Sequence, residues 1–342
     1  MSDELRCMPK RPCAITFTPD SKTILCGDKF GDVYALPLLP TSEELQAPVN
    51  AETPVKEEPK SFTPSATTLT VHSGRNRRAL EMQQKGGQPV KPKQSLAFAH
   101  ELLLGHVSML TDIAFVTDQE ILVGETRPRS YILTSDRDEH IRISRGPPQA
   151  HIIEGFCLGH KEFVNKIAII NSNTIISGGG DDYLLVWNLE KREVRRKVEL
   201  RPAVIDALKR LPDQNQDYLR DKKIAVSGIW TLSQDCALQE GTAAIILIAV
   251  EGVPALFSYA AERNDYDMKD SNWSLELDDP KLDGHLQTIP LGGNVLDVAL
   301  WGRRLLVSID NVHVPGSTER IREDKASNPY GLSSAKLTIL SG

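Results

Sequence analysis

The sequence TSDRDEHIRISR at residues 134–145 places carboxylates, guanidinium groups and an imidazole within twelve positions. Carboxylates beside a histidine are the groups that transfer protons or bind metals in enzymes. A second cluster, SGGGDD at 177–182, joins glycines to two carboxylates, and glycine-rich loops can bind phosphate. Ile141 and Ile143 alternate as in a strand. These groups therefore serve either chemistry or the construction of a β-sheet.

Neither cluster matches a known catalytic or cofactor-binding motif. No helix and no Lys-Ser/Thr pair follow the glycines of 177–182, so they do not form a phosphate-binding loop. The chain contains no GxSxG, no HExxH and no Cys/His spacing typical of a metal site. The sequence therefore predicts a protein that is not an enzyme and that holds no cofactor and no metal.

Composition narrows the class of protein further. The 342 residues suffice for one large domain or two ordinary ones, and a net charge of −6 argues against a protein that coats nucleic acid by itself. Five scattered cysteines without a CxxC pair indicate a reducing compartment, the cytosol or the nucleus. The N-terminal sequence shows no secretory signal, and the longest apolar run, 242–250, is too short for a membrane-spanning helix. That run is expected to be a buried strand, and no membrane association is expected.

Strand signals dominate the chain. Short runs rich in valine and isoleucine are punctuated by Gly, Asp, Asn and Pro, and no long segment has a 3.6-residue period, so an all-β fold is predicted. Residues 41–95 break this pattern, because they are rich in Pro, Glu, Lys, Ser and Thr and poor in large apolar residues. We expect them to be a disordered insertion between strands of the first structural unit. Their RNRR at 75–78 is either a localisation or phosphate-binding patch or a solvated charge cluster.

One pattern occurs twice along the chain. LLLGHVSMLTDIAFV at 102–116 and FCLGHKEFVNKIAII at 156–170 share LGH, a short polar gap and an apolar strand. The second copy continues through SGGGDD to VWN at 186–188. This spacing is typical of a WD repeat, which forms one blade of a β-propeller. About five such units can be recognised, which predicts a single WD-repeat β-propeller domain over 1–342.

The polar residues of the repeat have a structural explanation. His160 is expected to hydrogen-bond Asp181, which would tie the loop leading into a blade to the turn between its inner strands. Trp187 is expected to pack at the end of the third strand. By alignment, the preceding repeat has His106, Asp138 and Ser144 at the corresponding positions.

The charged turn 136–139 and the loop 159–163 should lie on the same rim of the propeller. Their mixed charges form either a solvated rim or a docking site for another protein, in which charge complementarity would set specificity.

Because a propeller has to close its ring to pair its strand edges, and the chain begins almost at an inner strand, either the ring is small or upstream blades are missing.

The segment SDRDEHIRIS followed by FCLGHKEFV resembles the WD-repeat, non-catalytic subunits of eukaryotic tRNA (guanine-N7-)-methyltransferases. GHVSMLTD and GDKFGDVYAL are similar to the same family, and the resemblance covers roughly residues 14–200. It implies a seven-bladed propeller in the nucleus, of which the N-terminal blades would be missing here. It also implies a heterodimer in which this subunit stabilises a separate S-adenosylmethionine-dependent methyltransferase, with tRNA bound through the complex as the substrate for 7-methylguanosine formation.

The resemblance also implies which residues contact the catalytic subunit. It singles out Lys166, with Lys161, Glu162 and Phe163 beside it, and more weakly Arg137. Strand alternation predicts that Lys166 is accessible at the rim. Two other functions remain open: a generic WD-repeat adaptor, such as a ubiquitin-ligase substrate receptor or chromatin scaffold, and a propeller hydrolase with a metal in its channel.

Overall fold

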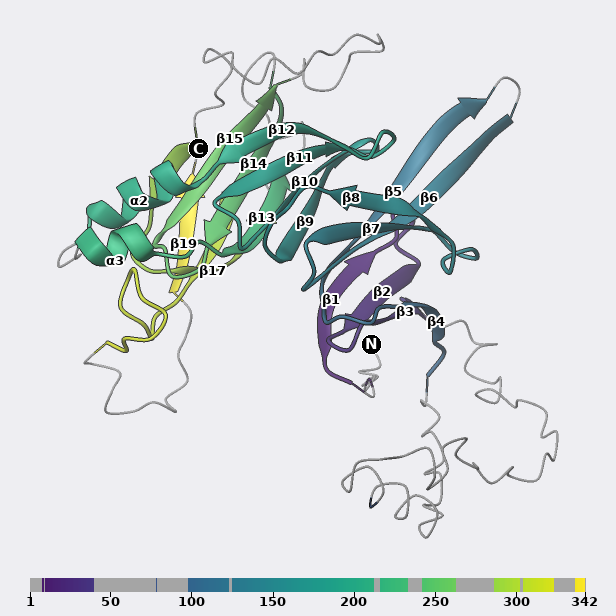
Figure 1. Ribbon diagram of the computed structural model, residues 1–342, viewed down its shortest axis with the longest axis horizontal. Coiled ribbons are helices and arrows are strands. Elements are labelled where there is room, and N and C mark those ends of the chain that lie inside the picture. Colours follow the sequence, from purple (N-terminus) through teal and green to yellow (C-terminus); the bar gives the residue numbers. More distant parts are fainter. Residues whose placement is uncertain are drawn as a thin grey trace. The chain divides into compact units, whose positions relative to one another are not determined.

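The computed structural model describes residues 8, 10–39, 78, 98–122, 125–211, 216–232, 242–262, 286–301, 304–322 and 336–341. Almost all of them belong to one compact unit, formed by Lys10–Leu36 and Glu101–Gly342 (Figure 1). The other unit, Met1–Pro9 and Pro37–His100, contains the predicted insertion 41–95. Apart from Arg78, that insertion lies outside the described residues.

The described strands form five antiparallel sheets, and within each sheet every strand pairs with the next one along the chain. The first sheet contains β1 (Pro12–Phe17), β2 (Thr23–Asp28), β3 (Asp32–Pro37) and β4 (Glu101–Gly105). The second contains β5 (Leu110–Leu122), β6 (Glu125–Asp136), β7 (His140–Arg145) and β8 (Ile153–Leu158). The third contains β9 (Val164–Asn171), β10 (Thr174–Gly179), β11 (Tyr183–Asn188) and β12 (Glu193–Glu199). The fourth contains β13 (Val226–Leu232), β14 (Thr242–Val250), β15 (Ala255–Glu262) and β16 (Gln287–Pro290), and the fifth β17 (Val295–Trp301), β18 (Arg304–Ile309) and β19 (Lys336–Ser341).

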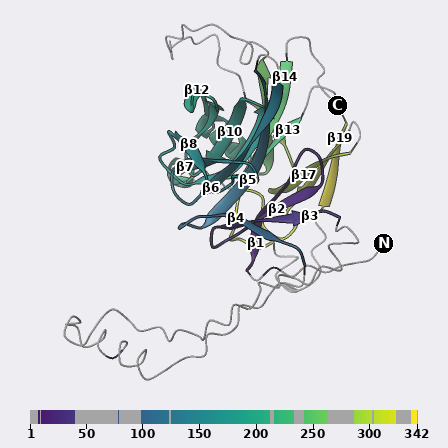
Figure 2. The same cartoon turned by 90° about the vertical axis from the view of Figure 1, so that its right-hand side faces the viewer.

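These sheets confirm the all-β prediction and correspond to the five predicted units. The first strand of each sheet contacts the first strand of the next, from β1 through β5, β9 and β13 to β17 (Figure 1, Figure 2). The first strands are therefore the inner strands, and each sheet is one blade of a propeller-type fold. A total of seven blades stays a prediction.

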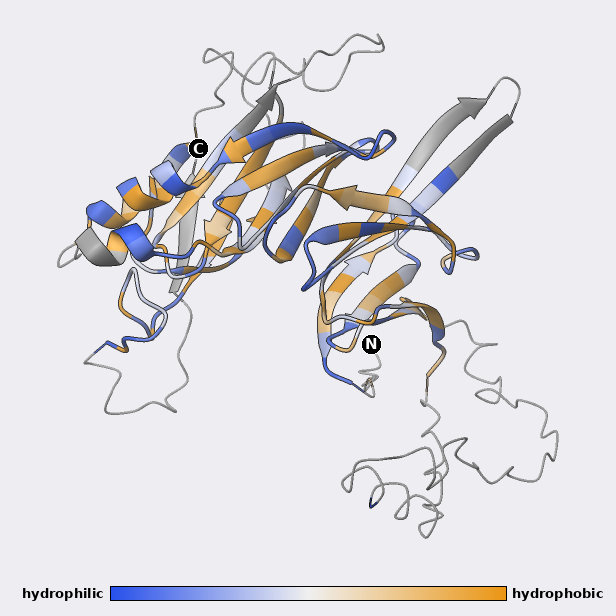
Figure 3. Ribbon diagram, in the orientation of Figure 1, coloured by the Kyte–Doolittle hydropathy of each residue, from blue (hydrophilic) through white to orange (hydrophobic). Residues whose placement is uncertain are grey.

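The hydrophobic cores lie between adjacent sheets. Leu133 of β6 packs with Ile175 of β10, and Ile176 of β10 packs in another cluster with Ile248 of β14. Sheets in the middle of the series thus bury both faces, and this explains why the run 242–250, now β14, is almost continuously apolar (Figure 3). Each fully buried aliphatic side chain contributes about 1.5–3 kcal/mol to folding.

Among the described residues between β12 and β13, two helices interrupt the strand pattern, and neither was expected from the sequence. In α2 (Arg201–Lys209), a proline in the first turn fixes a helical φ and lacks the N–H that a helix start leaves unpaired. Val204, Ala207 and Leu208 recur at helical spacing and are buried in the core between the third and fourth sheets. The helix α3 (Gln216–Asp221) follows and buries Leu219 in the same core. A helical period that lasts nine residues is too short to stand out among strands.

Within the described part of the chain, no helix has the length and apolar character needed to cross a membrane.

Candidate functional site

One end of the sheets carries both the turns between second and third strands and the loops that lead into the first strands. Backbone hydrogen bonds join these turns and loops: His106 N donates to Gly31 O (2.9 Å), Arg137 N to Met109 O (3.0 Å) and Gly180 N to Phe163 O (3.0 Å). We call this end the upper rim. Its turns are residues 28–32, 136–140 and 179–183, and its loops are 105–110 and 158–164.

A chain of buried hydrogen bonds fixes the upper rim of the third sheet. Trp187 Nε1 donates to Ser177 Oγ (2.7 Å), and His160 Nε2 lies 2.7 Å from the same oxygen. His160 Nδ1 lies 2.7 Å from Asp181 Oδ2. The indole N–H can only donate and the Asp181 carboxylate can only accept, so Ser177 Oγ accepts from Trp187 and His160 Nδ1–H donates to Asp181. The expected His160–Asp181 contact is therefore present, and Ser177 is a member that the sequence analysis missed.

This network is buried, since Ser177 is fully buried and His160 and Asp181 are 6% and 5% exposed, which favours a structural role over a catalytic one. Burial lowers the pKa of His160, although the hydrogen bond to Asp181 acts in the opposite direction, so the imidazole is neutral near pH 7. Asp181 also accepts a hydrogen bond from the backbone N–H of Lys161 (3.2 Å). The network therefore holds the loop that carries Lys161 and Glu162 in a fixed position against the β10–β11 turn.

The second sheet uses a different carboxylate from the one predicted. His106 Nδ1 lies 3.1 Å from Asp136 Oδ2 and Nε2 lies 2.8 Å from Thr134 Oγ1, whereas Asp138 is exposed. The assignment of Asp138 to the network is thus wrong. Asp136 ends β6 and corresponds by register to Gly179 of β10. Burial acts to raise the pKa of Asp136, but hydrogen bonds from His106 and from the Asp138 amide bring it below its ordinary value.

The register confirms that Ser144 takes the place of Trp187. In the third sheet, the Trp187 ring packs against the loop at Gly159. If Gly159 had a Cβ atom, that atom would lie 3.1 Å from a carbon of the Trp187 ring. In the second sheet, Arg142 Nε donates to Ser144 Oγ (3.0 Å) and Nη1 donates to Gly105 O (3.0 Å). In the second sheet, the Arg142 guanidinium group therefore links the start of the β4–β5 loop to β7. In the third sheet, the Trp187 indole packs against the corresponding β8–β9 loop instead.

We expect Asp181→Ala to lower the free energy of unfolding by roughly 1–3 kcal/mol, because it leaves buried donors unsatisfied. Asp138→Ala, at the aligned position of the second sheet, should change the stability by less than about 0.5 kcal/mol because its side chain is exposed. Urea denaturation of both variants measures the difference. Equal losses in the two variants would contradict the assignment of Asp136 as the partner of His106.

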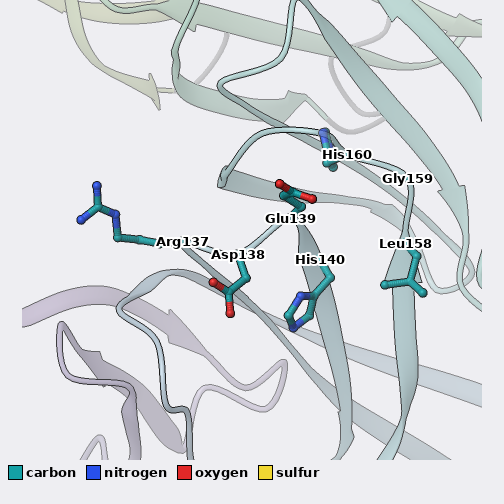
Figure 4. A pocket seen from close by; sticks show the side chains of 7 residues that line it. All are labelled: Arg137, Asp138, Glu139, His140, Leu158, Gly159 and His160. Atoms are coloured by element: carbon teal, nitrogen blue, oxygen red, sulfur yellow. The ribbon is translucent and has the colours of Figure 1, made fainter.

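A hollow of ≈ 500 Å³ opens on the upper rim between the β6–β7 turn and the end of β8. It is lined by Arg137, Asp138, Glu139, His140, Leu158, Gly159 and His160. Figure 4 shows the side chains of Asp138 and His140 next to each other and Arg137 extending away from them. Charges of both signs and one apolar side chain suit a protein partner better than a uniformly charged polymer.

The carboxylates beside the hollow do not form a convincing metal centre. Asp136, Asp138 and His140 offer ligand atoms within 4.8 Å of one another. However, the two oxygens of Asp136 already accept hydrogen bonds from His106 and from the Asp138 amide. A structural zinc site normally has four ligands, so this cluster is better explained as part of the turn.

The residues expected to contact a partner differ in their surroundings. Lys161, Glu162 and Phe163 are exposed on the β8–β9 loop, and Arg137 is exposed on the β6–β7 turn. The structure thus gathers them on the upper rim, and their role in binding stays a prediction.

Lys166 is less accessible than alternation predicted. It lies in β9 with a side chain that is 32% exposed, and its Nζ is 3.7 Å from Asp112 Oδ1 of β5. Asp112 Oδ2 also accepts a hydrogen bond from Ile167 N (2.9 Å). Burial raises the pKa of Asp112, and the Lys166 ammonium partly offsets this. Lys166 therefore joins two inner strands, whatever it contributes to a partner.

Apolar side chains also protrude from the upper rim, and the sequence analysis missed them. Leu158 at the edge of the hollow is 70% exposed, and Val107 and Met109 are exposed on the β4–β5 loop. The sequence contained one indication of this surface: Val107 and Met109 are apolar residues in the short loop after Gly105-His106, where polar residues are expected. Exposed apolar residues gathered on one surface are typical of protein contacts.

Comparison with known proteins identifies relatives over nearly the whole chain. Residues 2–334 match the family model described as the tRNA methyltransferase TRM82 WD40 domain. A Phaeosphaeria nodorum protein is 48% identical over 330 residues, which cover 93% of this chain and 62% of the relative. Proteins of Coccidioides immitis (45% over 332 residues, 95% and 59%) and Aspergillus oryzae (45% over 329 residues, 94% and 57%) are similar. All three are named tRNA (guanine-N(7)-)-methyltransferase non-catalytic subunit TRM82, and the chain spans about six tenths of their length.

Proposed function

Because this chain belongs to the TRM82 WD40 domain family, we propose that it acts as the non-catalytic subunit of a tRNA (guanine-N7-)-methyltransferase. It binds and stabilises the catalytic subunit in a heterodimer, and tRNA binds to the complex. The chain itself neither binds S-adenosylmethionine nor transfers the methyl group. The family match over residues 2–334 is the observation that carries this proposal. A nuclear location is part of the proposal and rests on the resemblance alone.

The upper rim is the surface that we assign to the catalytic subunit. Its loops are held by buried networks around His106 and His160, so a partner meets a surface that is already ordered. Preorganisation lowers the entropic cost of binding. The charged side chains of the rim can select the partner, and the exposed apolar side chains can supply affinity.

The two alternative functions have weaker support. A generic adaptor would be compatible with the fold, but the named relatives are methyltransferase subunits. A propeller hydrolase would need metal ligands, and the cluster around Asp136 is already engaged in hydrogen bonds. No observation on the described residues favours either alternative.

Co-expression of this chain with a tRNA (guanine-N7-)-methyltransferase catalytic subunit of the same organism tests the proposal. The two chains should co-purify in equal amounts, and the pair should methylate tRNA at guanine N7. The chain alone should show neither methylation nor S-adenosylmethionine binding by calorimetry. Methyl-donor binding by the chain alone, or a catalytic subunit indifferent to its presence, would disprove the proposal.

A further inference from the structure

The segment between β12 and β13 lies on the upper rim, because it leads into an inner strand as the β4–β5 and β8–β9 loops do. Its start is fastened to the β10–β11 turn. Leu200 N and Arg201 N both donate to Asp182 O, at 2.8 and 3.2 Å. The Arg201 guanidinium also binds both carboxylate oxygens of Asp182, at 2.6 and 2.9 Å. The helices that follow are thereby held at a defined place beside the third sheet.

This segment is much longer than a connection requires. Five residues connect β8 to β9, whereas residues 200–225, which contain α2 and α3, connect β12 to β13. The additional chain folds stably, since Val204, Leu208 and Leu219 are buried in the core of the third and fourth sheets. A folded helical insertion on a functional rim presents a surface that the sheets by themselves lack.

Among the described side chains of the insertion, four exposed basic residues (Lys209, Arg210, Arg220 and Lys223) outnumber two exposed acidic ones (Asp206 and Asp221). Lys209, Arg220 and Lys223 are exposed and form no ion pair with another described residue, whereas Arg210 pairs with Asp206 at 2.9 Å. Residues 201–223 contain six basic and four acidic side chains, in a chain with a net charge of −6. Among the described residues of the insertion, no large apolar side chain is exposed. In this respect the insertion differs from the rim around Leu158, where apolar and mixed-charge side chains suit a protein.

We propose that the α2–α3 insertion, through Lys209 and Lys223 and with Arg220 beside them, contacts the phosphate backbone of RNA bound to the complex. This inference rests on the proposed function and adds a second binding surface to it. Exposed ammonium groups bind phosphates and release the counterions condensed on the polyanion, which makes affinity depend on salt. Such contacts position the RNA without selecting its sequence.

The Lys209→Ala/Lys223→Ala double variant of the full chain, in complex with the catalytic subunit, tests the inference. Its affinity for a tRNA transcript at low salt should fall by about three- to tenfold, and the slope of log affinity against log salt should decrease by about 1 to 2. The matched control is Lys22→Ala/Lys191→Ala, two exposed lysines in the β1–β2 and β11–β12 turns at the opposite end of the sheets. The control should bind tRNA as the unmodified complex does.

A Lys209→Arg/Lys223→Arg variant, which keeps both charges, should retain the affinity. An alanine variant with the same affinity and salt slope as the control would overturn the inference, and intact methylation in that complex would leave the proposed function standing. Loss of the catalytic subunit from the alanine variant would also overturn it, because the insertion would then contact protein. Failure of the unmodified chains to associate would instead refute the proposed function.

Discussion

Trp187→Ala should lower the free energy of unfolding by about 3–5 kcal/mol, the range for removing a large buried aromatic side chain. The Trp187 side chain is fully buried and packs in the core between the second and third sheets. Its loss leaves a cavity and also removes the N–H that holds Ser177 against His160. Chemical denaturation followed by circular dichroism measures the change.

The chain supplies a matched control for this substitution. Trp301, at the end of β17, is 64% exposed, so Trp301→Ala should change the stability by less than about 0.5 kcal/mol. A small effect at Trp187, or equal effects at the two tryptophans, would show that the indole does not support the third sheet as described.

Leu158→Asp should weaken binding of the catalytic subunit by about 2 kcal/mol or more, which corresponds to roughly 30-fold in the dissociation constant. Leu158 is 70% exposed at the edge of the hollow, so the chain should fold with an aspartate there. The substitution removes an apolar anchor and places a third carboxylate near Asp138 and Glu139. Titration of the purified catalytic subunit measures the affinity.

Ile153→Asp is the control, because Ile153 lies at the other end of the same strand, β8, and is 46% exposed. It should leave the affinity unchanged. If both substitutions weaken binding equally, the upper rim is not the docking surface.

Lys166→Glu would be a poorer test of the same surface. The new carboxylate would face Asp112 and disturb the contact between β5 and β9, so lost binding could follow from a lost fold.

The blades and the main network of the third sheet could be predicted from the order of residues along the chain. Alternation of apolar residues, the spacing from LGH to the aspartate turn, and Trp187 are features of one sheet. Such features are short-range, because pairing between consecutive strands joins residues that are close in sequence. For this reason the five units and the His160–Asp181 contact follow from the sequence pattern.

Other features depended on the tertiary structure. Asp136 and Asp138 are two residues apart, and only the backbone path of the turn decides which carboxylate points toward His106. Lys166 meets Asp112 because the inner strands of two sheets pack together, a contact between residues far apart in sequence. The exposure of Leu158 depends on which segments pack next to the end of β8. The attachment of α2 to Asp182 depends on the position of the helix beside the β10–β11 turn. A periodic pattern specifies which face of a strand is apolar, but the neighbours that meet that face are selected by packing between sheets.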